Sequence, residues 1–83
     1  MTHTIDCRTC PDAHALHQAI ALALGFLPGY GCNLDALHDC LTDLREDTTL
    51  TFIGLDQLPF SRGFCRVLQD SAAENPHLTL RLL

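Results

Sequence analysis

The sequence predicts a single α/β domain in which a three-stranded parallel sheet is packed by three to four helices. Three short segments have the apolar or alternating pattern of strands, and three longer segments repeat apolar residues every three or four positions. Their order is strand, helix, helix, strand, helix, strand, so a helical crossover joins each pair of successive strands. A chain of 83 residues has room for one hydrophobic core, which makes residues 1–83 one predicted domain.

The N-terminal part is predicted to form a strand and a helix. Thr2–Asp6 is a short strand candidate with flanking threonines. A helix over Ala13–Leu24 follows, because Pro11 and Asp12 suit a first helical turn. Gly25 then supplies the stop. The apolar stripe of this helix recurs every four residues, at Leu16, Ile20 and Leu24.

A second helix is predicted over Asn33–Leu44, after a rigid, glycine-rich connection at Leu27–Gly31. Asn33 is a good N-cap because its side-chain oxygen can accept from a free backbone N–H of the first turn. The apolar face is a single stripe of leucines at spacings of three, four and three: Leu34, Leu37, Leu41 and Leu44. The charged segment Arg45–Asp47 ends the pattern.

The C-terminal part is predicted to form a strand, a helix and a final strand. Leu50–Ile53 is a buried strand candidate, bounded by polar residues and Gly54. A helix begins near Ser61 and ends before Asn75, which precedes a proline. Its predicted inner face consists of Phe64, Val67 and Leu68. Leu78–Leu82 alternates leucines with polar residues, as a half-buried strand does.

Composition narrows the classes of partner. The formal net charge is −5, with ten acidic residues against five arginines and no lysine. This balance disfavours nucleic acid as a ligand and suits a basic protein partner. We expect no membrane association and a cytoplasmic location, since the sequence contains neither an apolar run of about 18 residues nor a signal-peptide pattern. The five cysteines are then expected to be reduced thiols.

One face of the second predicted helix is acidic. Asp35, Asp39 and Asp43 are four residues apart and therefore form one column, with His38 and Thr42 beside it. Like charges at this spacing cost about 0.2–0.5 kcal/mol each, and no lysine or arginine occupies a neighbouring helical position. Two interpretations remain open from spacing alone: a merely solvated helix face, or a surface for a cationic partner.

The sequence around this column carries a family resemblance. The segment Tyr30–Thr42, with sequence YGCNLDALHDCLT, closely resembles the barstar family of intracellular inhibitors of barnase-type ribonucleases. The resemblance continues upstream at Leu16–Gln18 and downstream at Leu78–Leu80, and it is weakest over Arg45–Gly63. It implies a three-stranded parallel sheet packed by helices, in agreement with the element order read above. It also implies an inhibitor that needs no cofactor and plugs a ribonuclease active site with this helix and the loop before it.

By position in the motif, the resemblance implies that Asp39 takes the place of substrate phosphate and that Asp35 is a second acidic contact. Polar or backbone contacts would come from Gly31, Asn33 and Thr42, and a further acidic contact from the last helix would be Asp70. Tyr30 and Asp43 complete the predicted contact surface. This chain departs from the family at Gly29 and His38, where barstar has an aromatic residue and a tryptophan. The implied partner is therefore a basic, secreted microbial ribonuclease other than barnase, bound one to one.

A competing interpretation starts from Cys7, Cys10, His14 and His17, which together have ligand types that zinc prefers. The spacing of three residues between Cys10 and His14 is much tighter than in a finger-type site. The alternative function is a small zinc-stabilised or redox-sensitive protein-interaction domain with a non-nuclease partner. Catalysis is not expected, because the sequence contains no nucleophile elbow, phosphate loop or HExxH motif.

Overall fold

The computed structural model describes residues 1–26 and 28–83, and it contains one three-stranded sheet and three α-helices in that part of the chain. In chain order the elements are β1 (Thr2–Asp6), η1 (Cys7–Thr9), α1 (Ala13–Leu24), α2 (Leu34–Thr42), β2 (Thr48–Ile53), η2 (Leu55–Gln57), α3 (Ser61–Glu74) and β3 (Leu78–Leu82), where η marks a short 3₁₀ helix. Within the described ranges, no helix has the length and apolar character needed to cross a membrane.

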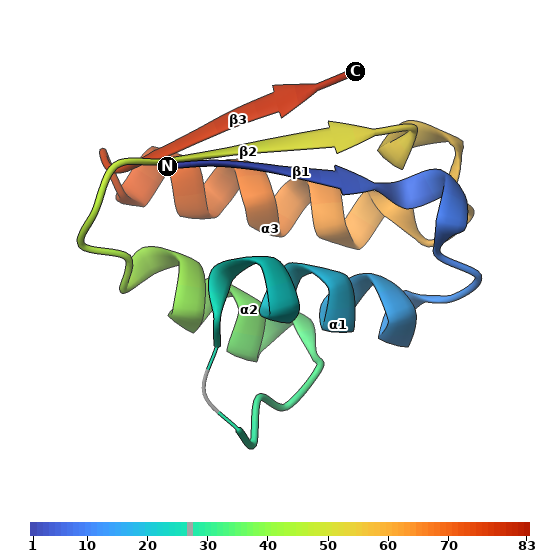
Figure 1. Ribbon diagram of the computed structural model, residues 1–83, viewed down its shortest axis with the longest axis horizontal. Coiled ribbons are helices and arrows are strands. Elements are labelled where there is room, and N and C mark those ends of the chain that lie inside the picture. The colour runs from blue at the N-terminus through green and yellow to red at the C-terminus, as the bar shows by residue number, and fades with distance from the viewer. Residues whose placement is uncertain (27) are drawn as a thin grey trace.

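The sheet is parallel throughout, as predicted. Its strand order is β1-β2-β3, and Leu50 in the central strand lies between His3 on one side and Leu80 on the other. All three α-helices lie on the same side of the sheet (Figure 1), where α1 contacts β1 and α3 contacts β3. α2 packs on α3, so the helix predicted to carry the site is supported mainly by another helix.

The core fills the space between the sheet and the helices. The strands contribute Ile5, Leu50, Phe52 and Leu78, and the helices contribute Leu16, Ile20, Leu37, Leu41, Phe64 and Leu68, all at most 5% exposed. Leu37 and Leu41 are the centre of the leucine stripe predicted for the second helix. Their complete burial turns the opposite, aspartate-bearing face of α2 toward solvent.

Several predicted boundaries are confirmed to the residue, and two needed correction. Thr2–Asp6, Ala13–Leu24 and Leu78–Leu82 have the predicted bounds, and Gly25 ends α1 with φ 67°. β2 begins two residues before Leu50, because two polar but β-branched threonines extend it. The second helix ends at Thr42 rather than Leu44, since its last turn tightens: Leu44 N donates to Leu41 O. Of the predicted rigid connection, Leu27 lies outside the described residues.

Candidate functional site

The start of α2 is held by the predicted N-cap. Asn33 Oδ1 accepts from Ala36 N at 2.8 Å, while the amide Nδ2 lies 3.4 Å from Gly31 O. A Cβ at Gly31 would lie 2.9 Å from Asn33 Nδ2, so any side chain there would disturb the cap. Between them, Cys32 adopts φ 50°, a backbone region that costs non-glycine residues about 1–2 kcal/mol. The loop therefore approaches the helix closely, and small residues make this approach feasible.

Carboxylates from two helices border one hollow. Asp35 and Asp39 on α2 and Asp70 on α3 are all exposed. They line a shallow hollow of about 360 Å³ between the helices, together with Leu34, His38 and Val67. The structure thus brings Asp70 to the acidic face of α2, although 31 residues separate it from Asp39 along the chain. Asp35 lies in the first turn, where the helix dipole favours a negative charge.

His38 is directed at α3, which the sequence interpretation missed when it placed this residue beside the acidic column. Its Nε2 lies 2.7 Å from Glu74 Oε2 and its Nδ1 lies 3.0 Å from Ser71 Oγ. Ser71 is fully buried, whereas 34% of the His38 side chain is exposed. The imidazole is therefore a link between α2 and α3. Sequence alone could not show this link, because its partners follow His38 by 33 and 36 residues.

The C-terminal end of α2 is tied to α3 by a second polar link, and the sequence analysis treated its central residue only as a helix terminator. Asn75 is 4% exposed, and its Nδ2 donates to Leu41 O at 2.8 Å and to Leu44 O at 3.1 Å. Its Oδ1 accepts from His77 N at 2.9 Å. Carbonyls at a helix end have few partners within the helix, so this amide gives Leu44 O a donor and adds a shorter bond to Leu41 O, which also accepts from Leu44 N at 3.4 Å.

Asp43 and Thr42 differ in what they offer to a partner. Asp43 is exposed and has a cation nearby, since Arg45 Nη2 lies 3.7 Å from Asp43 Oδ1. The aspartate column thus has a cation at this end, from Arg45 beyond the helix, although no lysine or arginine occupies a neighbouring helical position. The hydroxyl of Thr42 donates to His38 O at 2.9 Å and to Asp39 O at 3.2 Å, so α2 itself uses that donor.

Tyr30, the remaining aromatic of the predicted surface, is a packing residue. Its hydroxyl lies 2.7 Å from His17 Nδ1, and its ring contacts Phe26 with centroids 5.1 Å apart. Burial raises the pKa of Tyr30 and lowers the pKa of His17, so both groups are neutral at pH 7. This contact fixes the loop before α2 to α1.

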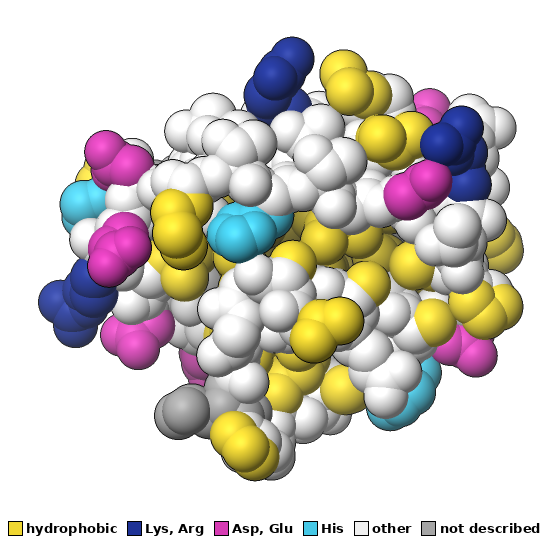
Figure 2. Space-filling view, viewed as in Figure 1, with side chains coloured by type: hydrophobic (Ala, Val, Ile, Leu, Met, Phe, Trp, Pro, Cys, Tyr) yellow, Lys and Arg dark blue, Asp and Glu magenta, His cyan; other side chains and the backbone are white. Residues whose placement is uncertain are grey.

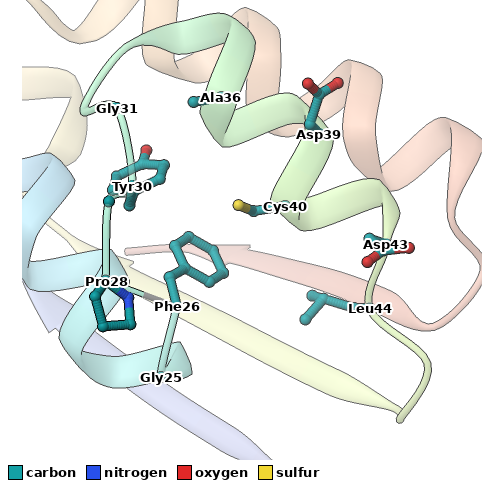
Figure 3. A pocket seen from close by; sticks show the side chains of 11 residues that line it. Gly25, Phe26, Pro28, Tyr30, Gly31, Ala36, Asp39, Cys40, Asp43 and Leu44 are labelled. Atoms are coloured by element: carbon teal, nitrogen blue, oxygen red, sulfur yellow. The ribbon is translucent and has the colours of Figure 1, made fainter.

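A larger hollow lies between that loop and α2. It has a volume of about 480 Å³ and is lined by Gly25, Phe26, Pro28, Gly29, Tyr30, Gly31, Ala36, Asp39, Cys40, Asp43 and Leu44. Figure 3 shows the Cys40 thiol directed toward the rings of Phe26 and Tyr30, with Asp39 and Asp43 farther out along the helix. Gly29 belongs to its loop wall, and a Cβ at that position would meet nothing within 4 Å. The sequence analysis related Gly29 to the contact surface, but it did not relate Phe26, Cys40 or Leu44 to that surface.

The residues of the zinc interpretation do not form a site. Within residues 1–26 and 28–83, no three His, Cys, Asp or Glu side chains gather in a way that could hold a metal ion. His17 contacts Tyr30 instead, and Cys7 is fully buried. Burial raises the pKa of Cys7 to about 11 and also raises the pKa of Cys10. Both are therefore neutral thiols at pH 7, which are poor nucleophiles.

The arrangement presents negative charge on a convex, well-supported helix. Figure 2 shows acidic side chains gathered at the end of the molecule where α2 leads into β2. Hollows lie beside α2 toward the loop and toward α3, and Asp39 borders a hollow on each of these sides. A family model described as Barstar (barnase inhibitor) matches residues 1–77 of the chain. No curated protein matches the chain.

Proposed function

The chain belongs to the barstar family, whose members are ribonuclease inhibitors rather than enzymes, and we propose that it inhibits a basic ribonuclease by covering the active-site cleft with α2 and the loop before it. Asp39 enters the phosphate-binding part of the cleft in this proposal. Asp35 and Asp70 contact cations beside it. The complex is one to one, needs no cofactor and forms in the cytoplasm, where RNA of the producing cell requires protection.

The observation that carries the proposal is the grouping of Asp35, Asp39 and Asp70 around one hollow between α2 and α3. All three carboxylates are exposed, and no arginine among the described residues lies within ion-pair distance of them. A ribonuclease cleft concentrates cationic groups that bind phosphate and stabilise the charge of the transition state. Carboxylates on a helix can satisfy those groups without offering a bond that the nuclease can cleave.

Rigidity supports the same interpretation. α2 is capped by Asn33 at its start and bound by Asn75 at its end, while His38 links its middle to α3. A surface that is ordered before binding loses less conformational entropy when the complex forms. The net charge of −5 also favours fast encounter with a basic protein, and this part of the effect weakens as ionic strength rises.

The test is inhibition of RNA cleavage by a panel of basic, barnase-type secreted ribonucleases. We expect at least one nuclease to be inhibited, and we expect Asp39→Ala to weaken its binding by roughly 2 kcal/mol or more, about a thirtyfold rise in Kd. The barnase–barstar pair is itself a reference case for such interface hot spots, so this magnitude is the general threshold for a hot spot rather than a value derived from the structure.

Asp56→Ala is the matched control, since Asp56 is an exposed aspartate on η2 that lies outside the hollows beside α2. It should leave Kd within about twofold, in keeping with a charge remote from the interface. Equal Kd values for wild type, Asp35→Ala and Asp39→Ala against an inhibited nuclease would rule out the acidic-helix mechanism. Inhibition of none of the panel would rule out the proposed partner class.

A further inference from the structure

Two adjoining hollows form a trough along the side of α2 that faces the loop. The larger, of about 480 Å³, lies between the loop and the helix. The second, of about 420 Å³, is lined by Asp39, Cys40, Thr42 and Asp43. Asp39, Cys40 and Asp43 belong to both hollows. The trough therefore runs from an apolar interior, past the Cys40 thiol, to an outer end with two carboxylates.

The inner part of the trough suits an apolar chain. Its walls are the rings of Phe26 and Tyr30 on one side, and Ala36, Cys40 and Leu44 on the other (Figure 3). Burial, and then the neighbouring Asp39 and Asp43, raise the pKa of Cys40, so the thiol is neutral at pH 7 and behaves as a small apolar group. Among the described residues that line the trough, none carries a positive charge.

The outer part suits a planar cation. Asp39 and Asp43 are four residues apart, and side chains at this spacing on a helix are neighbours about 5–6 Å apart at Cβ. A guanidinium group has five N–H donors in a rigid plane and can contact two carboxylates at once. A lysine ammonium is a compact point charge and lacks this reach.

We propose that the trough is a subsite for one arginine side chain of the partner nuclease, with its aliphatic part between the two aromatic rings and α2 and its guanidinium between Asp39 and Asp43. This inference rests on the proposed function and adds a recognition element to it. It assigns Asp43 a role in specificity, because a partner without an arginine at this place would leave Asp43 without a guanidinium from the nuclease and the apolar hollow unfilled.

Arg45 supports this assignment from within the chain. Its Nη2 lies 3.7 Å from Asp43 Oδ1, and the two side chains are 87% and 80% exposed. Asp43 thus already has a guanidinium group nearby, in a long and exposed contact that a better-placed group can replace. Arg45 is consequently a competitor of the arginine that enters the trough.

The experiment uses small probes, so that it does not depend on a nuclease. The ¹⁵N-labelled full chain is titrated with N-acetyl-arginine methylamide and, in parallel, with N-acetyl-norleucine methylamide and guanidinium chloride. We expect the arginine probe to bind more tightly than either of the others and to shift the amide signals of Gly29, Cys40 and Asp43. We also expect Asp43→Asn to weaken its binding by about two- to fivefold, as for the loss of an exposed ion pair.

Two matched controls separate the subsite from a general effect of charge. Asp56→Asn removes the same charge elsewhere and should leave the affinity for the arginine probe unchanged. Arg45→Gln should tighten binding more than Arg62→Gln, because Arg62 is exposed on α3 and lies outside the trough. Equal affinities for the arginine and norleucine probes, equal effects of Asp43→Asn and Asp56→Asn, or no shifts at the trough would each overturn the proposal.

The proposed inhibitor function and the proposed arginine subsite can be refuted independently of each other. If the arginine probe binds as described but no ribonuclease is inhibited, the subsite remains and the partner class is wrong. If a ribonuclease is inhibited through Asp39 but the probe does not select the trough, the inhibitor function remains and the arginine subsite is wrong.

Discussion

The amide of Asn75 fixes the end of α2 that carries Asp39 and Asp43, and Asn75→Asp tests this with a change of almost no volume. The carboxylate that this change introduces can still accept from His77 N, but it cannot donate to Leu41 O and Leu44 O. Each lost hydrogen bond is worth about 0.5–1.5 kcal/mol, and Leu44 O, left without a donor, costs about 1–3 kcal/mol, whereas Leu41 O keeps its 3.4 Å bond from Leu44 N. Repulsion between the carboxylate and two carbonyl oxygens adds to this. We expect the free energy of unfolding to fall by about 3 kcal/mol at pH 7.

This loss is measurable, because a domain of this size has a free energy of unfolding of about 4–12 kcal/mol. Urea denaturation followed by circular dichroism should show a lower midpoint with an unchanged slope. Asn33→Asp is the matched control: aspartate keeps the oxygen that caps α2 and loses only the long, exposed 3.4 Å contact with Gly31 O, so stability should stay within about 0.5 kcal/mol of wild type. A loss below about 1 kcal/mol for Asn75→Asp, or equal losses for both variants, would refute the reasoning.

Three further predictions concern the supports of the site. Tyr30→Phe removes the hydroxyl that contacts His17, and it should lower the free energy of unfolding by about 1 kcal/mol in urea denaturation. Burial lowers the pKa of His17, so as pH falls this imidazole is protonated in the unfolded chain before it is protonated in the folded chain. The stability linked to His17 is therefore complete above about pH 6.5 and is lost as pH falls through the folded-state pKa. His17→Gln should flatten that part of the pH dependence of stability between pH 7.5 and 5, and an unchanged slope would contradict the assignment. Glu74→Ala removes the carboxylate that contacts His38 Nε2, and it should cost less than about 1 kcal/mol in thermal or urea unfolding because this carboxylate is largely exposed.

Local patterns predicted most of the fold, whereas the supports of the site depend on contacts that no local pattern contains. The leucine stripe of α2 and the cap at Asn33 are readable because they follow from helix geometry within a dozen residues. The contacts of His38 with Ser71 and of Asn75 with Leu41 join positions more than 30 residues apart. They exist only once α2 packs on α3, and a helix terminator or a surface histidine looks the same in the sequence with or without them.

The supports of α2 and its acidic face use different residues, and this separates the stability of the fold from the proposed function. The burial of Leu37 and Leu41, with the amide of Asn75, holds the helix, whereas the carboxylate of Asp39 is exposed and makes no hydrogen bond or ion pair within the described part of the chain. Removing that charge relieves repulsion from the aspartates one turn away, worth about 0.2–0.5 kcal/mol for each pair. Asp39→Asn should therefore unfold at an equal or slightly higher urea concentration while it binds the nuclease far more weakly. A clear loss of stability in this variant would mean that Asp39 is a structural residue, and only Asp35 on α2 and Asp70 on α3 would then remain as carboxylates of the proposed binding surface.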